Sequence, residues 1–230
     1  MADHRRDATV RRRNRGQGSY PLVCPPRGRC NTRMTDLILA SKSASRQAIL
    51  RGAGIPFIAQ PSDVDEGAIK SRERAAGQSP GEIALILAEA KALALSVPEQ
   101  KIVIGCDQVL EFEGHLYDKP VDMPEAKARL LRMAGHTHYL RSGLVVAQGG
   151  GIIWRYRDVA RLTMRPVTVA GVEAYLDCVG PRILNTVGGY ELEAEGVRLF
   201  DSVEGDYFTI LGLSLFPLMA FLREREILPW

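Results

Sequence analysis

The segment from Leu37 to Arg46 constrains the fold of this chain more than any other stretch. Leu37 to Ala40 has the pattern of a short buried strand, and it runs directly into a polar turn and then a helical pattern. A strand–turn–helix unit of this kind gathers Ser41, Ser43, Arg46 and backbone N–H groups at the positive end of a helix. Such a point suits a phosphate, although serines at this position often only cap the helix. Both interpretations stay open from the segment alone.

Strand-like and helix-like patterns alternate from Thr35 onward, which predicts a mixed α/β fold. Capping signals place helix starts after Ser79, Asp122 and Thr168. We expect helices over about 80–96, 123–135, 168–180 and 215–225, and strands over about 101–110, 138–148, 152–165 and 208–211. Residues 111–117 continue as a hairpin around Gly114, and Gly149 to Gly151 join the two long strands. Because several of these strands form hairpins, the sheet is not a simple doubly wound parallel one.

Charge is placed unevenly along the chain. Residues 1–33 hold nine arginines, two aspartates and no lysine, so their net charge is about +7. Because the whole chain carries +3, residues 34–230 carry about −4. This segment lacks apolar periodicity, so we predict a disordered basic extension over 1–33 and a globular domain over 34–230. A targeting peptide, a tail for anionic partners, and a segment upstream of the functional start all fit it; Met34 favours the last. The acidic remainder argues against nucleic-acid binding.

Two charged residues stand in apolar surroundings. Asp107 interrupts the predicted strand 101–110, so its carboxylate must be paired, metal-bound, or at a strand end that faces a cleft. The structural alternative is a strand-terminal aspartate hydrogen-bonded to a loop. Lys91 shares a face of the predicted helix with alanines and leucines, so it either extends to solvent or meets an anion in a cleft.

Two polar segments complete a set of candidate ligands for polyphosphate. Asp63 to Glu66 holds three carboxylates in four residues. Clustered oxygen ligands with a phosphate partner are what Mg²⁺ or Mn²⁺ requires, although most acidic loops are only solvated. Lys119 follows the predicted hairpin in an extended turn, where an exposed lysine is the default. With Arg46 and Lys91 these groups fit a triphosphate and a divalent metal. The chain has no Walker loop and no Gly-x-Gly-x-x-Gly, which argues against P-loop and Rossmann mechanisms.

Eight short motifs follow one another from Leu37 to the last predicted helix. They are Ser41-x-Ser43-x-x-Arg46, Asp63-x-Asp65-Glu66, Ala88-x-x-Lys91-Ala92, Gly105-x-Asp107-Gln108, Asp118-Lys119-Pro120, Gly135-x-x-His138, Gly188-Gly189-Tyr190 and Glu204-Gly-Asp-Tyr-Phe-Thr-Ile-Leu-Gly212-Leu213. In this order they resemble the Maf family, whose members are nucleoside triphosphate pyrophosphatases once named for an effect on septum formation. The resemblance covers nearly everything except the basic extension.

The resemblance implies a two-lobed α/β fold with a mixed sheet and a central cleft, similar to inosine-triphosphate pyrophosphatases. It implies hydrolysis of the α–β phosphoanhydride of a nucleotide, with Mg²⁺ or Mn²⁺, to a nucleoside monophosphate and pyrophosphate. The family's general base falls on Asp107. Its other polar site positions fall on Ser41, Arg46, Glu66, Lys91 and Lys119.

The chemistry of these side chains agrees with such roles. Asp107 would take a proton from the attacking water, and Glu66 would help to hold the metal. Arg46, Lys91 and Lys119 would neutralise the charge that builds on the leaving pyrophosphate. A serine hydroxyl and nearby backbone N–H groups would cradle one phosphate.

Two positions of the resemblance bear on the substrate. The family has one branch that prefers dTTP and UTP and another that resembles a 7-methyl-GTP pyrophosphatase. The second branch has Gln after the catalytic Asp and Glu in the Gly-rich loop, which here are Gln108 and Glu193. A carboxylate can accept hydrogen bonds from the guanine N1–H and exocyclic amine, which favours the methylated-purine branch. A large or basic residue often precedes the family's arginine, whereas Ser45 is small.

Localisation and partners follow from absences and from the resemblance. No run of about 18 apolar residues and no secretory segment occurs, and four scattered cysteines suit a reduced cytoplasmic protein. We expect a nucleoside triphosphate substrate, no membrane and no stable nucleic-acid partner, and a homodimer by family resemblance only. The alternative from another class is a nucleotide-sensing, division-linked interaction protein, motivated by the basic extension and the family's septum history.

Overall fold

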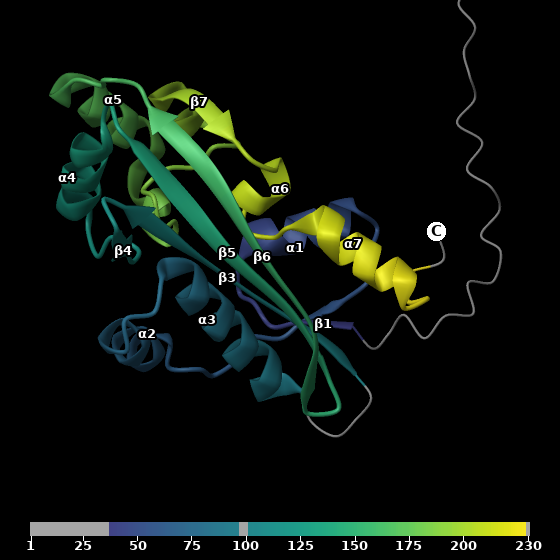
Figure 1. Ribbon diagram of the computed structural model, residues 1–230. Coiled ribbons are helices and arrows are strands. Elements are labelled where there is room, and N and C mark those ends of the chain that lie inside the picture. The colour runs from purple at the N-terminus through teal and green to yellow at the C-terminus, as the bar shows by residue number, and fades with distance from the viewer. Residues whose placement is uncertain (1–36, 97–100, 229–230) are drawn as a thin grey trace, which may run out of the picture. The chain divides into compact units, whose positions relative to one another are not determined.

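A seven-stranded mixed sheet organises the residues that the computed structural model describes, 37–96 and 101–228 (Figure 1). Its order is β2-β1-β3-β5-β6-β7, with β4 also paired to β3. The first half of the chain supplies β1 (Leu37–Leu39), α1 (Ala44–Gly52), β2 (Ile58–Ala59), α2 (Glu66–Ala75), α3 (Pro80–Leu95), β3 (Ile102–Phe112) and β4 (His115–Tyr117). The second half supplies α4 (Met123–Met133), β5 (Thr137–Gln148), β6 (Gly151–Met164), α5 (Val169–Val179), the 3₁₀ segments Gly180–Asn185 and Glu195–Leu199, β7 (Phe200–Glu204), α6 (Tyr207–Ile210) and α7 (Leu215–Glu224). The predicted extension over 1–33 lies outside the described residues.

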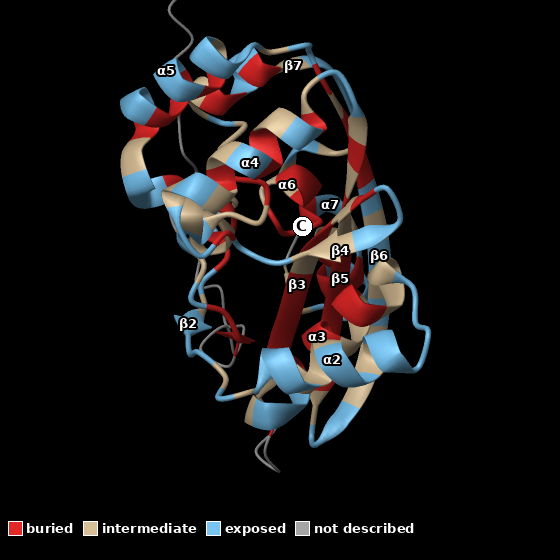
Figure 2. Ribbon diagram, turned by 90° about the vertical axis from the view of Figure 1, so that its left-hand side faces the viewer, coloured by how far each residue is buried: buried red, intermediate tan, exposed pale blue. Residues whose placement is uncertain are grey.

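Side-chain alternation along the long strands divides the core into separate clusters. Odd-numbered β3 residues such as Val103 and Val109 pack against α3. Even-numbered residues face the other side, where Ile104 packs with α1 and α7 and Leu110 packs with α4 and α5. Two helical lobes therefore share one face of the sheet, at opposite ends of the strands. Figure 2 shows β3 and β5 buried, whereas α2 has no buried residue.

The sheet has a gap beside the middle of β3. On this edge β3 pairs with β1 only at residues 102–104 and with β4 only at residues 110–112. The intervening residues keep their partner β5 on the other edge, where Asp107 lies opposite Gly143. Backbone and side chains around residue 107 therefore open toward a space that β1 and β4 do not fill.

Two glycines bring α3 very close to the sheet. A Cβ atom at Gly105 would lie 2.1 Å from the Ala88 carbonyl oxygen, and one at Gly143 would lie 2.5 Å from the Ala84 carbonyl oxygen. No larger residue fits at either position without displacing the helix backbone. This approach places Lys91, one turn beyond Ala88, directly beside Asp107.

The structure confirms the mixed α/β class and the predicted capping residues. Ser79, Asp122 and Thr168 each accept a backbone N–H at the start of α3, α4 and α5. The predicted strand over 208–211 is wrong, because Asp206 caps the short helix α6 there and accepts from the Thr209 N–H. The short apolar run that suggested a strand fits a buried helical turn equally well.

A second correction concerns Asp107. The pattern predicts that the strand is interrupted or ends at this residue, but β3 runs through it without a break. The alternative of a paired carboxylate is confirmed, because Asp107 contacts Lys91. The missing strand partner on one edge, rather than a strand end, gives the carboxylate its opening. In addition, α2 and β7 form where no element was expected. Within the described ranges, no helix is both long and apolar enough to cross a bilayer.

Candidate active site

One cleft of about 1230 Å³ lies over the gap in the sheet and between the two lobes. All eight side chains predicted for the site line it: Ser41, Arg46, Glu66, Lys91, Asp107, Gln108, Lys119 and Glu193. They come from segments up to about 150 residues apart in the sequence, so tertiary structure brings them together. Their individual roles stay predictions.

Lys91 is the electrostatic centre of this cleft. Its Nζ lies 2.5 Å from Asp107 Oδ1 and 2.8 Å from Glu66 Oε1. The side chains of Lys91 and Asp107 are 9% and 8% exposed, so their charges are largely removed from water. Burial alone would cost several kcal/mol per ion, and it is offset because each charge has a partner at contact distance. Of the two interpretations of Lys91, the anion-facing one is confirmed.

The pKa values follow this arrangement. Burial lowers the pKa of Lys91, but the neighbouring Asp107 and the hydrogen bond to Glu66 outweigh burial, so the pKa is raised above its ordinary value. Burial likewise acts to raise the pKa of Glu66. Its hydrogen bond to Lys91, with the charges of Lys91, Lys70 and Arg46, reverses that effect and lowers the pKa. Both groups are therefore charged at neutral pH.

Arg46 ties three segments together at the start of α1. Its Nε donates to the Gly212 carbonyl at 2.8 Å, and its Nη1 donates to the Cys106 carbonyl at 3.0 Å and to Ser41 Oγ at 3.2 Å. The Cys106 carbonyl belongs to the unpaired edge of β3. Within the described part of the chain, no hydrogen bond uses Nη2, which leaves that amine for an anion in the cleft. Ser43 is the helix cap, so the capping interpretation holds for this serine.

Lys119 reaches the cleft on a loop that a buried arginine holds. Arg129, on α4, donates through Nη1 to the Asp118 carbonyl and, at 2.7 Å, to the Val187 carbonyl. Its Nη2 contacts Glu125 Oε1 at 2.6 Å. Arg129 is not among the predicted site residues, although its place on the apolar face of α4 is a detectable signal. Arg129 thereby links the loop that carries Lys119 to the Gly-rich loop.

The Gly-rich loop has a second anchor in the core. His138 is fully buried on β5, and its Nε2 lies 2.7 Å from the hydroxyl of Tyr190. Burial lowers the pKa of His138 to about 4, so the imidazole is neutral near pH 7. Tyr190 fixes the loop three residues before Glu193.

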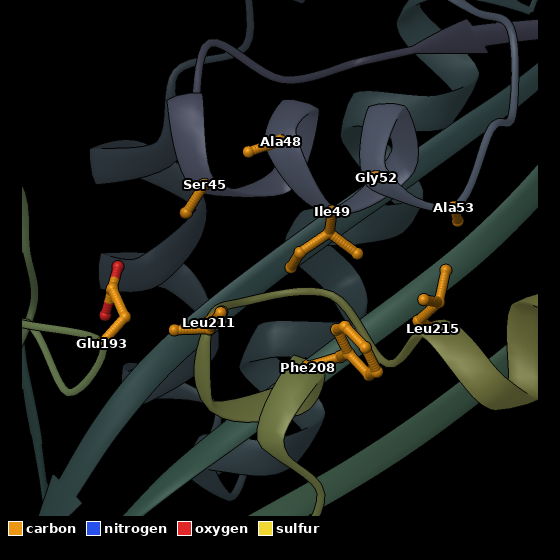
Figure 3. A pocket seen from close by; sticks show the side chains of 9 residues that line it. All are labelled: Ser45, Ala48, Ile49, Gly52, Ala53, Glu193, Phe208, Leu211 and Leu215. Carbon is orange, nitrogen blue, oxygen red and sulfur yellow. The ribbon is translucent and has the colours of Figure 1, made fainter. Parts of the chain in front are cut away.

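Glu193 stands at one end of a second, apolar pocket of about 470 Å³ (Figure 3). Among the described residues that line this pocket, no other is charged. Ser45 and Leu211 line both the pocket and the larger cleft, so the two lie side by side. Gln108 lines the larger cleft only, and its amide nitrogen donates to the Thr209 carbonyl at 2.7 Å and to Ser142 Oγ at 3.1 Å.

The residues present fit a divalent cation that binds together with phosphate. Within the described residues, no three His, Cys, Asp or Glu side chains form a ready metal cluster. Mg²⁺ ordinarily uses one or two protein carboxylates and takes its other ligands from phosphates and water. Glu66 and Asp107 each use one carboxylate oxygen for Lys91 and keep the other, which supplies that number of ligands. Asp65 instead caps α2.

This cleft places three cationic side chains beside paired carboxylates, an arrangement that suits a protein that binds a polyanion. Residues 36–225 match the family described as Maf-like protein. A nucleoside triphosphate pyrophosphatase of Caulobacter vibrioides is 48% identical over 190 residues, which cover 83% of this chain and 96% of the relative. A 7-methyl-GTP pyrophosphatase of Brucella suis is 42% identical over 191 residues, covering 83% and 96%.

A 7-methyl-GTP pyrophosphatase of Mesorhizobium japonicum is 44% identical over 188 residues, covering 81% of this chain and 94% of the relative. A HAM1 protein from Coxiella burnetii superposes with a TM-score of 0.36 and 15% identity, over 57% of this chain and 74% of that one. The chain belongs to the Maf family.

Proposed function

We propose that this Maf-family nucleotide pyrophosphatase acts on 7-methyl-GTP or a similarly modified nucleotide and releases the monophosphate and pyrophosphate. The observation that carries the proposal is the buried Lys91, held between Asp107 and Glu66 in a cleft that Arg46 and Lys119 also line. Three cations around two carboxylates match a triphosphate that is attacked by water. Relatives named nucleoside triphosphate pyrophosphatase and 7-methyl-GTP pyrophosphatase support the proposal.

In this proposal Asp107 is the general base. Lys91 holds Asp107 through Oδ1, which leaves Oδ2 to take a proton from the attacking water. The water oxygen bonds to the α-phosphorus, the bond from that phosphorus to the bridging oxygen breaks, and pyrophosphate leaves. Arg46 and Lys119 offset the negative charge that develops on the leaving group.

Glu66, through the carboxylate oxygen that Lys91 does not contact, would hold Mg²⁺ or Mn²⁺ with the substrate phosphates. Such a cation supplies further charge neutralisation on the phosphate oxygens. Ser41 contributes indirectly, because its hydroxyl accepts from Arg46 Nη1 and from the Ser43 N–H and so fixes the turn where a phosphate would lie. We place the enzyme in the cytoplasm, and a homodimer rests on family resemblance alone.

The base would lie between the main cleft and the apolar pocket. Glu193 stands at the junction, where its carboxylate can accept from the guanine N1–H and exocyclic amine. A 7-methylated guanine also carries positive charge, which complements this carboxylate. The Gln108 amide nitrogen already donates a hydrogen bond to the Thr209 carbonyl. Gln108 therefore acts on the base through its carbonyl oxygen, or indirectly through its bond to Thr209.

The test is pyrophosphate release from 7-methyl-GTP, GTP, dTTP, UTP and CTP, with Mg²⁺ or Mn²⁺. We expect 7-methyl-GTP to be preferred and Asp107→Asn to lose about 10²- to 10⁴-fold in kcat. Asp177→Asn, an exposed aspartate on α5, is the matched control and should retain full activity. Release of phosphate instead of pyrophosphate would overturn the reaction, and preference for dTTP or UTP would overturn the substrate.

A nucleotide-sensing, division-linked role is the second candidate. It rests on the basic segment 1–33 and on the family's septum history. Loss of a division phenotype on deleting residues 1–33, with catalysis intact, would favour that role. Loss of the phenotype in Asp107→Asn but not in the truncation would eliminate it.

A further inference from the structure

The apolar pocket continues far beyond Glu193, along the side of α1. Its α1 wall is one face of the helix, made by Ser45, Ala48, Ile49, Gly52 and Ala53 (Figure 3). From residue 45 to residue 53 this wall is about 12 Å long, at about 1.5 Å per residue. The length exceeds what a base at Glu193 would cover.

The far end of the pocket is both open and apolar. Phe208, Leu211 and Leu215 form the wall opposite α1. At this end Gly52, the last residue of α1, and Ala53, its C-cap, line the pocket, and a Cβ atom built on Gly52 meets no atom within 4 Å. The neighbouring side chains therefore leave this space open. Among the described lining residues, only Glu193 and Ser45 are polar, and both lie toward the main cleft.

The pocket is also positioned for an extension of the nucleotide. Ser45 and Ala48 line both the pocket and the main cleft, and Arg46 lies between them on α1. A ligand whose phosphates contact Arg46 can thus pass the small Ser45 side chain and enter the pocket. Burial of an apolar substituent there would contribute about 25 cal/mol per Å² of surface removed from water.

We propose that this pocket binds an apolar substituent, larger than a methyl group, on the base of the substrate. The substrate class then includes nucleoside triphosphates whose base carries a bulky alkyl or aryl group, and the enzyme removes them by the same α–β cleavage. This inference rests on the proposed function, because it takes the base to lie at Glu193 and the phosphates at Arg46.

The experiment compares 7-benzyl-GTP with 7-methyl-GTP, using the full chain and the release of pyrophosphate. In the wild-type protein we expect kcat/KM for the benzyl compound to equal or exceed that for the methyl compound, within about threefold. Gly52→Leu and Ala53→Leu fill the far end of the pocket. Each should lower the benzyl-to-methyl ratio by about tenfold or more.

A matched control keeps the comparison specific. Ala75→Leu adds the same side chain at an exposed position of α2, and it should leave the ratio unchanged. Circular dichroism checks that each variant is folded. If both filled variants misfold, the benzyl-to-methyl ratio of kcat/KM in the wild-type protein still tests the proposal.

The outcomes separate this inference from the proposed function. Hydrolysis of 7-methyl-GTP with about hundredfold slower hydrolysis of 7-benzyl-GTP would overturn the pocket inference and leave the proposed function intact. A ratio that the filled variants do not change would also overturn it. Failure to hydrolyse either compound, with turnover of other nucleotides, would overturn both.

Discussion

Helices α3 and α1 pack on opposite faces of the sheet, and they differ in how closely they meet their neighbours: α3 contacts the sheet, and α1 faces the segment that carries Phe208 and Leu215. α3 lies so close that Gly105 and Gly143 have no room for a Cβ atom. α1 leaves an open pocket beside Gly52, where a Cβ atom would contact nothing. The close approach brings Lys91 to contact distance of Asp107, as the proposed mechanism needs. The loose approach leaves room for a ligand, so tight and open packing serve different needs of one site.

The largest effect is expected from Lys91→Met, which removes the charge at the centre of the close interface. The change leaves Asp107 and Glu66 without their shared cation, so kcat/KM should fall at least about hundredfold. The free energy of unfolding should fall by about 3 kcal/mol, as for other buried pairs that lose one partner. Steady-state kinetics and urea unfolding measure both.

Lys127→Met is the control for that variant. The Lys127 Nζ lies 2.5 Å from Glu173 Oε1, the same distance as in the Lys91–Asp107 pair, but on the surface of α4. We expect the free energy of unfolding to change by less than about 1 kcal/mol, with no loss of activity. Equal effects of the two substitutions would show that burial does not distinguish these pairs.

Gly105→Ala tests the close approach itself. The added Cβ atom would lie 2.1 Å from the Ala88 carbonyl, so α3 must move away from the sheet. Overpacking of this kind costs about 1–3 kcal/mol, and displacement of Lys91 should lower kcat more than it raises KM. Urea unfolding and kinetics on the same preparation check the result. Unchanged stability would mean that α3 can shift freely and that its contact does not position Lys91.

A moderate, pH-dependent effect is expected from Glu66→Gln. The pKa of Glu66 is lowered in the folded protein, so its charge stabilises the fold at pH values above 4.5, the ordinary pKa of the group. That contribution to stability is lost as the pH falls through the lowered pKa that Glu66 has in the folded protein. Since the side chain is 46% exposed, we expect only about 1 kcal/mol at pH 7.

The measurement for this variant is the difference in unfolding free energy between wild type and Glu66→Gln, from pH 7 to pH 3. The difference should shrink toward zero at the acid end. A substitution in the apolar pocket, such as Ala48→Leu, should give a difference that does not vary with pH in this way. A constant difference for Glu66→Gln would contradict the charge interaction with Lys91.

The smallest effect is expected from Gly52→Ala, the counterpart of Gly105→Ala on the open side. The backbone there is helical and the added methyl group meets nothing within 4 Å, so no strain arises. Replacing a helical glycine should raise the free energy of unfolding by about 0.4–1 kcal/mol, because the unfolded chain loses entropy. Thermal and urea unfolding detect a gain of this size, and a loss instead would show that the pocket is closed in solution.

Much of the site could be predicted because its side chains carry unusual signals in the sequence. Lys91 on an apolar helix face and Asp107 in an apolar strand are each costly unless paired, so their chemistry was visible in advance. Arg129 carries the same signal on α4 but was missed, because its partners outside α4 are the backbone carbonyls of Asp118 and Val187. Backbone acceptors have no residue-specific sequence pattern, and only the fold reveals them.

The sequence by itself determined the local structure: helix starts at Ser79, Asp122 and Thr168, the hairpin turn at Gly149 to Gly151, and the stock of charged groups. These features depend on hydrogen bonds that close within a few residues, so the nearby sequence contains all the partners. It erred at 208–211, where a short apolar run is compatible with helix or strand.

Only the tertiary structure decided where those groups meet. The gap in the sheet beside Asp107 depends on how far β1 and β4 extend along β3. The contact of Arg46 with the Gly212 carbonyl joins residues 166 positions apart. The open pocket beside Gly52 depends on how α1 lies against the segment that carries Phe208. Such features arise from strand register and from the packing of whole elements, which local sequence patterns do not encode.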